Sequence, residues 1–402
     1  MTLLDKLSDR AVWERFYEYK SSLACPKQTL KELRKFIDSE EYLPVCGAIE
    51  RGEPFPLPRR CEISKFSSSK KRIVYVYPKA HNVVLKLLTY LMLRKYDGIF
   101  SPGLYSFRPH RTAKDAFRYV MRRTRGKEYS YKADVSNYFN SVDIPTFLPE
   151  LKEVLSDDPA LYDFLSSLLS EERVLERGCE ITEKKGIMAG TPIASFFANV
   201  YLKELDRSFY ERGVTYARYS DDVIVFSDTG EGVKEYAGEI KEYLASRRLS
   251  VNPAKEEYGT PEDGFTFLGF RCREGRVDIA PATVAKLKRK MRRKSRALVR
   301  WRERNGVDGE KAASAFIRIF NRKLLDSPTD NELTWSCWFF SVINTADSLK
   351  VIDKYAEDCI RFIVSGKRTK ARYNVRYSDL KRLGFRSLVH EYYSYDKKRD
   401  SV

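Results

Sequence analysis

Hydrophobic positions in the N-terminal hundred residues change from a helical to a strand pattern. In residues 1–45 apolar side chains recur every three or four positions, which predicts amphipathic helices. Three prolines in residues 52–60 end that pattern. Two runs of strand composition, 61–66 and 71–78, then flank a turn rich in Ser and Lys and predict an antiparallel hairpin. Residues 80–96 follow with the pattern of a core helix.

Helical and strand patterns alternate in the middle of the chain. They predict a strand at 130–135, helices at 145–155, 193–212 and 232–248, and hairpins at 216–227 and 265–279. This order is that of a split βαβ sheet, so the predicted fold class is α+β. Residues 284–304 then keep one apolar stripe, which includes Val284, Met291 and Trp301, among eleven Lys and Arg residues. Residues 312–402 are helical and combine aromatic with basic side chains.

Two adjacent acids, Asp221 and Asp222, lie at the centre of the predicted hairpin at 216–227. Strand-like runs flank them, so a tight turn would hold both carboxylates with little freedom. A third acid, Asp134, follows a strand-like run 87 residues earlier. Neighbouring strands can bring such acids together, and facing carboxylates can hold two Mg²⁺ ions roughly 3.5–4 Å apart for phosphoryl transfer. Asp-Asp is also common in solvated β-turns, which is the alternative interpretation of the pair alone.

Seven strings of the sequence resemble motifs of one protein family. KADVSNYFNSVD, GIMAGTPIASFFANVYLKELD, ARYSDDVIVFS, LSVNPAKEE and FTFLGF are similar, in order and spacing, to the palm motifs of reverse transcriptases. Upstream, KKRIVYVYPKAHNVVLKLL and YSFRPHRTAKDAF resemble fingers motifs of the bacterial branch, which contains group II intron maturases, retron enzymes and defence-associated enzymes. The resemblance covers roughly residues 60–272.

The resemblance implies a right-hand polymerase, with fingers and a split βαβ palm followed by an α-helical thumb and a C-terminal helical segment. We therefore expect N-terminal helices and fingers in residues 1–100 and the palm with the catalytic site in 101–278. The thumb helix is expected in 279–310, and a basic helical RNA-binding segment in 311–402.

The same resemblance implies catalytic roles for individual residues. Asp134 and Asp221 would hold two divalent cations, Mg²⁺ with Mn²⁺ as the alternative, while Asp222 would support the primer-side ion. The Val135 carbonyl would add an oxygen ligand, and Lys255 would stabilise or protonate the leaving pyrophosphate. Polymerisation is attack of a primer 3′-hydroxyl on the α-phosphorus of a dNTP, so positioning and charge neutralisation supply most of its catalysis.

Contacts to the nucleotide and the primer are also implied by the resemblance. Lys65 and Arg72 would clamp the triphosphate, although both could simply be exposed hairpin charges. The bulky Phe139 ring would collide with a ribose 2′-hydroxyl, so dNTPs should be preferred. The expected primer-grip residues are Phe267, Leu268 and Gly269, where the glycine would let the backbone approach the primer closely.

The chain departs from the family pattern in the motif that contacts the incoming nucleotide. The family commonly has Gln-Gly there, and the aligned residues are Ala189 and Gly190. Alanine cannot form the hydrogen bond that the glutamine side chain provides. We therefore expect altered fidelity, and greater similarity to the divergent defence-associated enzymes than to intron maturases.

The net charge of +18 is concentrated near the C-terminus. Residues 281–402 hold 29 Lys and Arg against 14 Asp and Glu, a net charge of +15. Such a surface attracts polyanions and releases counterions on binding, so nucleic acid is the expected partner. Solvated helix faces, or attraction to another acidic surface, are the alternatives. The predicted nucleic-acid contacts are Arg289, Arg292, Arg293 and Arg296.

Composition disfavours several other classes of protein. Seven cysteines are scattered without a CxxC pair and only three histidines occur, which leaves little for a zinc site or a disulfide framework. No apolar run approaches the ~18–20 residues that span a bilayer, and the N-terminus carries acids. We expect a cytoplasmic protein with no membrane partner.

The resemblance to the defence-associated reverse transcriptases implies an RNA-directed DNA polymerase that adds dNTPs to a primer in anti-phage defence, and the acids and the basic surface agree with it. A structured non-coding RNA would serve as template or scaffold, and DNA would be the product. Retron-type or maturase-like enzymes and a template-independent DNA polymerase are the enzymatic alternatives. An RNA-binding splicing factor is the non-enzymatic one, which the clustered acids disfavour because buried acids are costly without cations. The sequence leaves the template, the primer and the oligomeric state open.

Overall fold

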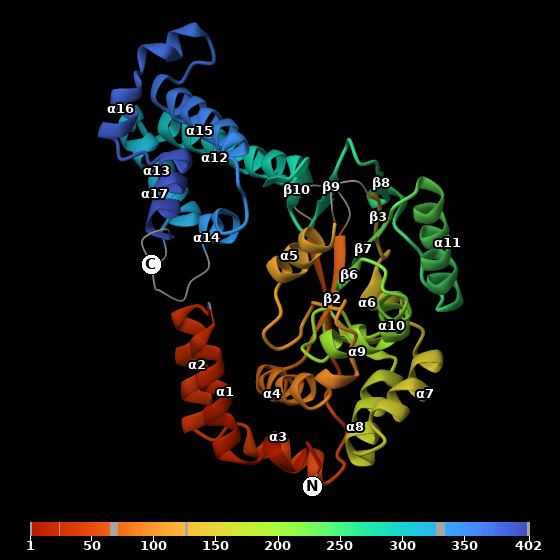
Figure 1. The fold of residues 1–402 in the computed structure, drawn as a ribbon. Coiled ribbons are helices and arrows are strands. Elements are labelled where there is room, and N and C mark those ends of the chain that lie inside the picture. The colour runs from red at the N-terminus through yellow and green to blue at the C-terminus, as the bar shows by residue number, and fades with distance from the viewer. Residues whose placement is uncertain (1, 24, 65–70, 125–127, 327–333, 400–402) are drawn as a thin grey trace. The chain divides into compact units, whose positions relative to one another are not determined.

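The computed structural model describes two compact units, Met1–Pro261 and Glu262–Val402 (Figure 1). The described residues are 2–23, 25–64, 71–124, 128–326 and 334–399. Strands and helices occur in both units, so the predicted α+β class is confirmed. The predicted hairpin at 265–279 belongs to the second unit.

Three N-terminal helices form a small aromatic core, as their apolar periodicity predicts. They are α1 (Arg10–Ser22), α2 (Lys27–Asp38) and α3 (Leu43–Glu50). The Trp13 ring contacts Phe16, Phe36 and Tyr42, and its indole nitrogen donates to the Leu7 carbonyl at 2.7 Å. Phe16 in turn contacts Tyr90 of α4 (Lys79–Lys95), which joins this core to the rest of the unit.

A four-stranded sheet contains the predicted hairpin and two strands that the sequence analysis missed. Its strands lie in the order β2 (Lys71–Val76), β1 (Arg59–Ser64), β4 (Arg173–Glu176) and β5 (Cys179–Thr182). The strands β1 and β4 pair in parallel although they are far apart in the sequence. Arg60 links the two regions because its guanidinium pairs with Glu176 at 2.5 Å and with Glu183 at 3.1 Å.

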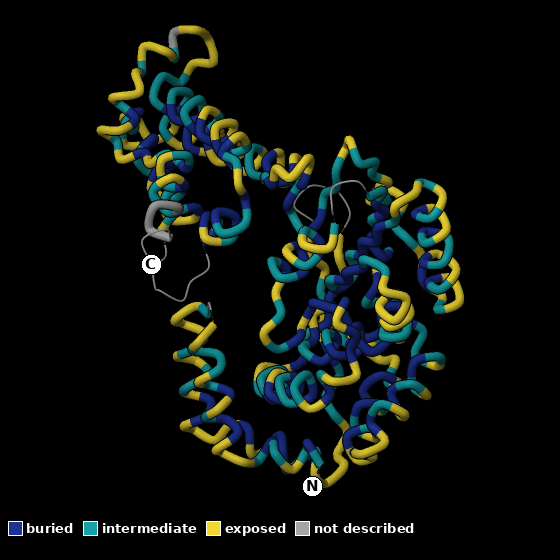
Figure 2. The backbone as a smooth tube through the Cα atoms, in the orientation of Figure 1, coloured by how far each residue is buried: buried dark blue, intermediate teal, exposed yellow. Residues whose placement is uncertain are grey.

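The central sheet of the first unit has the split βαβ order predicted from the sequence. Its strands lie in the order β6 (Tyr216–Tyr219), β7 (Asp222–Ser227), β3 (Tyr129–Asp134) and β8 (Glu257–Gly259), and each neighbouring pair is antiparallel. Helix α11 (Gly230–Ser246) packs on β3 and β7. Buried backbone is concentrated in this sheet and in the helices beside it (Figure 2).

The remaining helices of the first unit differ from the prediction at one point. They are α5 (Ala113–Arg123), α6 (Tyr138–Ser141), α7 (Ile144–Val154), α8 (Pro159–Ser170), α9 (Ala194–Tyr201) and α10 (Lys203–Glu211). The single helix predicted at 193–212 is wrong, because the chain breaks at Leu202 between α9 and α10. No Gly or Pro stands there, and α10 carries Asp206 to a buried arginine on β6, so tertiary packing accounts for the break.

The second unit combines a short sheet with helices. Its described elements are β9 (Phe265–Phe267), β10 (Phe270–Arg273), β11 (Arg276–Ile279), α12 (Pro281–Asn305), α13 (Gly309–Leu324), α14 (Trp335–Phe340), α15 (Asp347–Ser365), the 3-10 helix η4 (Lys370–Asn374), α16 (Tyr377–Arg382) and α17 (Leu388–Arg399). The predicted hairpin at 265–279 is a three-stranded meander, because a tight turn follows each of its first two strands. Val284 and Met291 are buried as predicted, whereas Trp301 is 41% exposed.

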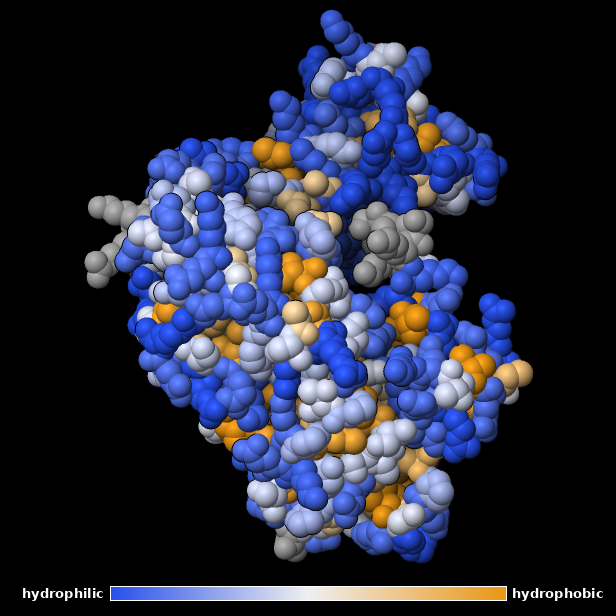
Figure 3. Space-filling model, turned by 90° about the vertical axis from the view of Figure 1, so that its right-hand side faces the viewer, coloured by the Kyte–Doolittle hydropathy of each residue, from blue (hydrophilic) through white to orange (hydrophobic). Residues whose placement is uncertain are grey.

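Hydrophilic side chains cover most of the face shown in Figure 3, and apolar side chains gather there only in small patches. Among the large hydrophobic residues, Ile63, Tyr258, Tyr373 and Tyr393 are about half exposed. Every helix in the described part of the chain is too short or too polar to span a lipid bilayer.

Candidate active site

The adjacent acids lie at a tight hairpin between β6 and β7. Tyr219 pairs with Asp222, which leaves Ser220 and Asp221 as a two-residue turn. Ser220 has a φ of +61°, the left-handed conformation that such turns require. The turn therefore fixes the backbone of both acids, as the sequence pattern predicts.

The third acid faces this hairpin across the sheet. In the β3–β7 ladder Asp134 pairs directly with Asp222, and residues paired in this way project from the same face of a sheet. The Val135 amide donates to the Asp221 carbonyl at 2.9 Å, so the ladder continues past the end of β3. The structure thus brings together Asp134, Asp221 and Asp222, although 87 residues separate the first two.

The carboxylates form an electrostatically strained group. Burial raises the pKa of Asp222 to about 6, and the neighbouring charges of Asp221 and Asp134 add to that effect. Burial and Asp134 also raise the pKa of Asp221. The Lys255 ammonium donates to the buried Asp134 carboxylate. Burial lowers the pKa of Lys255, but the hydrogen bond to Asp134 and the nearby acids outweigh it and leave this pKa raised. The charges of Arg72 and Lys132 also act on Asp221 and Asp222, respectively, and oppose the effect of burial on their pKa values.

This donor set suits a hard cation that takes further ligands from a substrate. Within the described residues, no group of three or more His, Cys, Asp or Glu side chains forms a metal-binding cluster. The acids therefore do not make a closed cage, and Asp134 is engaged by Lys255. Mg²⁺, however, usually takes only one or two protein carboxylates together with substrate phosphates. Burial and repulsion together raise the pKa of Asp221 and Asp222, and a divalent cation would offset both effects.

A buried ion pair connects the hairpin to α10, and the sequence analysis missed it. Arg218 on β6 and Asp206 on α10 are both fully buried and form two hydrogen bonds, of 2.7 and 2.6 Å. The Tyr216 hydroxyl also donates to Asp206 at 2.8 Å. The Arg218 guanidinium then donates to the Ser220 carbonyl at 3.2 Å, which ties the turn beside Asp221 to α10. The available signal was an arginine inside a strand whose other residues are apolar or aromatic.

Of the two predicted triphosphate contacts, the structure describes Arg72. Arg72 is exposed on β2, and its charge acts on Asp221, whose pKa it lowers against the effect of burial. Arg72 is therefore within electrostatic range of the acids. Lys65 lies outside the described residues.

Phe139 and the loop around Ala189 meet at a junction with β2. The Phe139 ring is half-buried and contacts Tyr138, while its carbonyl accepts from Ile187 at 2.8 Å. Ala189 is 2% exposed, and its amide donates to the Asn140 side chain at 3.0 Å. The Ala189 carbonyl accepts from Tyr75 of β2 at 2.7 Å. Position 189 thus contributes backbone contacts and a buried methyl group.

Gly190, the next residue, also packs against β2 and has a positive φ, which favours glycine. Its φ is +97°, and a Cβ at this position would lie 2.9 Å from the Val74 Cβ. The close packing on β2 accounts for the glycine.

The predicted primer-grip residues form a tight turn in the second unit. Leu268 and Gly269 connect β9 to β10, and both have positive φ, at +50° and +89°. A leucine in this conformation is unusual. Phe267 is buried, and the Gly269 carbonyl accepts from Ala280 at 2.8 Å, so the turn is anchored to the start of α12.

The predicted nucleic-acid contacts lie along one exposed side of α12. Arg289, Arg292, Arg293, Arg296 and Arg300 line a shallow groove of about 320 Å³. In the described part of the chain, four of them have no ion pair with a carboxylate, namely Arg289, Arg292, Arg296 and Arg300. Their charge is therefore available to a polyanion.

Comparison with known families identifies the class of protein. The model of the family "Reverse transcriptase (RNA-dependent DNA polymerase)" matches residues 63–272, slightly more than half of the chain. The chain therefore belongs to the reverse transcriptase family. The matched range includes the three acids and the turn at Leu268 and Gly269.

The individual relatives that match have low sequence identity to this chain. The chain is 20% identical over 239 residues to the group II intron-encoded protein LtrA of Lactococcus lactis subsp. cremoris, covering 58% of this chain and 39% of LtrA. It thus spans about two-fifths of the length of the curated relatives that it matches.

Two solved structures also match. Apo telomerase from Candida tropicalis, truncated from its C-terminal domain, has a TM-score of 0.44 and 13% identity over 56% of this chain and 55% of that chain. Telomerase from Candida albicans with a fragment of telomeric RNA has a TM-score of 0.44 and 11% identity over 87% and 70%.

Proposed function

We propose that the protein is an RNA-directed DNA polymerase with Asp134, Asp221 and Asp222 at its catalytic centre. The observation that carries this proposal is the pairing of Asp134 with Asp222 beside a turn that holds Asp221. Membership of the reverse transcriptase family supports it. A non-catalytic RNA-binding role would not account for three acids held together when burial and mutual repulsion raise the pKa values of Asp221 and Asp222.

The chain's own residues would bind and orient the substrates. Asp134, Asp221, Asp222 and the Val135 carbonyl would hold two Mg²⁺ or Mn²⁺ ions, which when bound would neutralise phosphate charge and activate the primer hydroxyl. Lys255, which donates to Asp134, would move to a substrate phosphate once a cation neutralises that carboxylate.

Residues around the acids would select and align the nucleotide and the primer. Arg72, with Lys65, would align the triphosphate of a dNTP. The Phe139 ring would exclude ribonucleotides, and the backbone at Ala189 and Gly190 would shape the same pocket. Phe267, Leu268 and Gly269 would support the primer.

The proposed template is a structured RNA held by the second unit. The unpaired arginines of α12 support this part of the proposal, because phosphate binding needs exposed cations without carboxylate partners. We further propose that this RNA is non-coding and that its copying serves anti-phage defence. The replacement of the usual glutamine by Ala189 supports a divergent branch of the family.

Replacing both hairpin acids tests the catalytic assignment. Asp221→Asn with Asp222→Asn should abolish dNTP incorporation on an RNA template with an annealed DNA primer. Folding stability should hold or rise, since like-charge repulsion is removed. The matched control is Asp228→Asn, which removes an exposed carboxylate at the other end of β7 and should leave incorporation unchanged. Undiminished Mg²⁺-dependent incorporation by the double variant would exclude this centre.

The ratio of rNTP to dNTP incorporation tests the proposed role of Phe139 in nucleotide selection. Phe139→Val should raise incorporation of rNTPs relative to dNTPs, because the proposed barrier is steric. Phe139→Tyr keeps the ring and should keep the wild-type ratio. An unchanged ratio in the valine variant would leave Phe139 with its packing role against Tyr138.

A further inference from the structure

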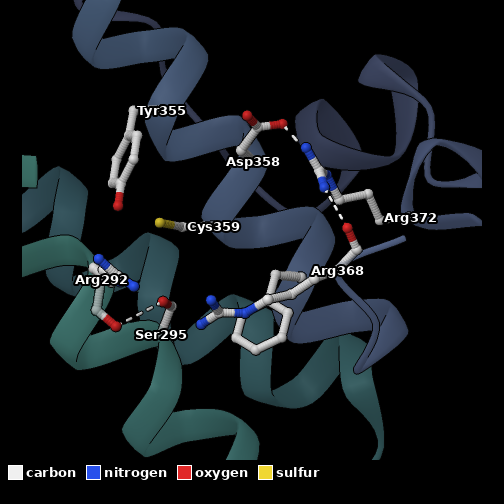
Figure 4. A pocket seen from close by; sticks show the side chains of 8 residues that line it. Arg292, Ser295, Tyr355, Asp358, Cys359, Arg368 and Arg372 are labelled. Carbon is white, nitrogen blue, oxygen red and sulfur yellow. Dashed lines mark hydrogen bonds and ion pairs between the residues drawn. The ribbon is translucent and has the colours of Figure 1, made fainter. Parts of the chain in front are cut away.

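A pocket of about 150 Å³ lies within the second unit, between α12, α15 and the start of η4 (Figure 4). It is remote in sequence from the three acids, and the proposed catalysis does not use it. Its lining residues are Arg292, Ser295, Tyr355, Asp358, Cys359, Phe362, Arg368 and Arg372.

The three arginines that line this pocket carry more positive charge than its one carboxylate, Asp358, can neutralise. Asp358 lies 3.7 Å from the Arg372 guanidinium and 3.9 Å from that of Arg361, so two arginines already share it. Neither Arg292 nor Arg368 forms an ion pair with any residue that the structure describes. Two guanidiniums therefore face the pocket without a carboxylate, which favours an anionic ligand.

The neutral polar groups of the pocket can also donate hydrogen bonds to an anion. Figure 4 shows the Tyr355 hydroxyl, the Cys359 thiol and the Arg292 guanidinium turned toward one another. The Ser295 hydroxyl beside them already donates to the Arg292 carbonyl at 3.0 Å, so it does not count among these donors. Burial raises the pKa of Cys359 to about 11, so its thiol is protonated at neutral pH. The charges of both Arg292 and Arg368 act on the Tyr355 hydroxyl, which places the two cations close to it.

Packing holds one of the cations in place. The Arg368 guanidinium lies over the Phe362 ring at 4.8 Å from its centroid, a stacking arrangement that fixes the plane of the guanidinium. The Arg372 side chain donates to the Arg368 carbonyl at 2.7 Å and fixes the backbone there. A site ordered in this way loses little conformational entropy when a ligand binds.

We propose that this pocket holds a single phosphate group of the bound RNA. This inference rests on the proposed function, since it assumes that RNA is the partner of the second unit. The volume of about 150 Å³ accommodates a phosphate group. The phosphate can be a terminal one at a strand end or a backbone one, and both would meet the same donors.

The test compares two variants that each remove two unpaired positive charges. The pocket variant is Arg292→Gln with Arg368→Gln. The matched control is Arg289→Gln with Arg300→Gln, which lie on α12 but do not line this pocket. Binding of a short single-stranded RNA with a 5′-phosphate, and of the same RNA with a 5′-hydroxyl, is measured for the full-length protein at several salt concentrations.

The pocket variant should lose roughly ten- to a hundredfold in affinity, because charge-assisted hydrogen bonds are removed, and the control should lose only a few-fold. A loss confined to the 5′-phosphorylated RNA identifies a terminal phosphate, and an equal loss on both RNAs identifies a backbone phosphate. Equal losses in the pocket variant and the control would overturn the pocket and leave the proposed function intact. A wild-type protein that binds neither RNA would instead overturn RNA binding by this unit.

Discussion

Three arginines of the first unit and four arginines on α12 differ in whether a carboxylate pairs with them. In the first unit, Arg218 is fully buried and paired with Asp206, and Arg60 and Arg108 are each paired with carboxylates. On α12, four exposed arginines have no ion pair within the described residues, namely Arg289, Arg292, Arg296 and Arg300. The first group forms ion pairs within the protein, whereas the charge of the second group is available to a ligand.

The difference follows from the cost of burial. Removing an ion from water costs several kcal/mol, so a buried arginine needs a carboxylate with good geometry. An exposed arginine keeps its hydration, and a surface ion pair would add only about 0–1 kcal/mol. The arginines of α12 can therefore stay unpaired at little cost to folding. Changes to the first group should affect stability, and changes to the second should affect ligand binding.

Breaking the buried pair should have the largest effect on stability. Asp206→Ala leaves Arg218 charged and unpaired in the interior, so the free energy of unfolding should fall by about 3–5 kcal/mol. Urea unfolding followed by circular dichroism measures this change. Glu239→Ala is the matched control, because its partner Arg212 is exposed and the pair should contribute about 1 kcal/mol or less. A fall of less than about 1 kcal/mol for Asp206→Ala would show that the buried pair does not hold the hairpin.

Lys185 is an exception in the first unit that sharpens the comparison. It is 3% exposed, its ammonium donates to the Glu171 carbonyl, and it forms no ion pair within the described residues. Burial lowers its pKa to about 8. The charged form is therefore disfavoured in the folded state, and this penalty is complete below about pH 8. It decreases as the pH rises toward 10.5, the ordinary lysine pKa, where the unfolded chain also loses the proton.

Lys185→Met should consequently raise the free energy of unfolding at pH 7, by about 1–3 kcal/mol. Its advantage over the wild type should shrink between pH 8 and pH 10.5, and the difference between the two unfolding curves measures this effect. The exposed neighbour provides the control, since Lys184→Met should change stability little at either pH. A variant less stable than the wild type at pH 7 would mean that the hydrogen bond to Glu171 outweighs the burial penalty.

The sequence could predict where the three candidate catalytic acids meet because their signals are local. Asp221 and Asp222 lie between two strand-like runs, and Asp134 follows a third, so composition alone locates the turn and the strand. The partner of Arg218 has no such signal, because Asp206 lies on a helix whose charge pattern is that of a solvated face. The break between α9 and α10 at Leu202 accompanies the contact of Asp206 with Arg218, and the hydrophobic periodicity of the sequence does not indicate it.

Other features of the fold depend on contacts between distant segments. The strands β4 and β5 are short and charged, and β4 gains its place by pairing with β1, more than a hundred residues earlier. Leu268 adopts a positive φ that its residue type does not favour, so the sequence predicts a hairpin there but not the turn itself. Trp301 continues the apolar spacing of α12 and is nevertheless exposed. Periodicity indicates a helix but does not say where its neighbours end.

The smallest effect on stability is expected for a double substitution on α12, and this variant tests the difference between the two groups of arginines most directly. Arg289→Gln with Arg296→Gln should weaken RNA binding by a few-fold at low salt and less at high salt. The slope of log affinity against log salt should fall by about 0.7 for each phosphate of single-stranded RNA that is no longer neutralised, while the free energy of unfolding changes by less than about 0.5 kcal/mol. Arg247→Gln is the opposite case, because Arg247 is largely buried and pairs with Glu150. It should lower stability and leave the salt slope unchanged. If both variants changed the same quantity, the division between structural and ligand-binding arginines would be wrong.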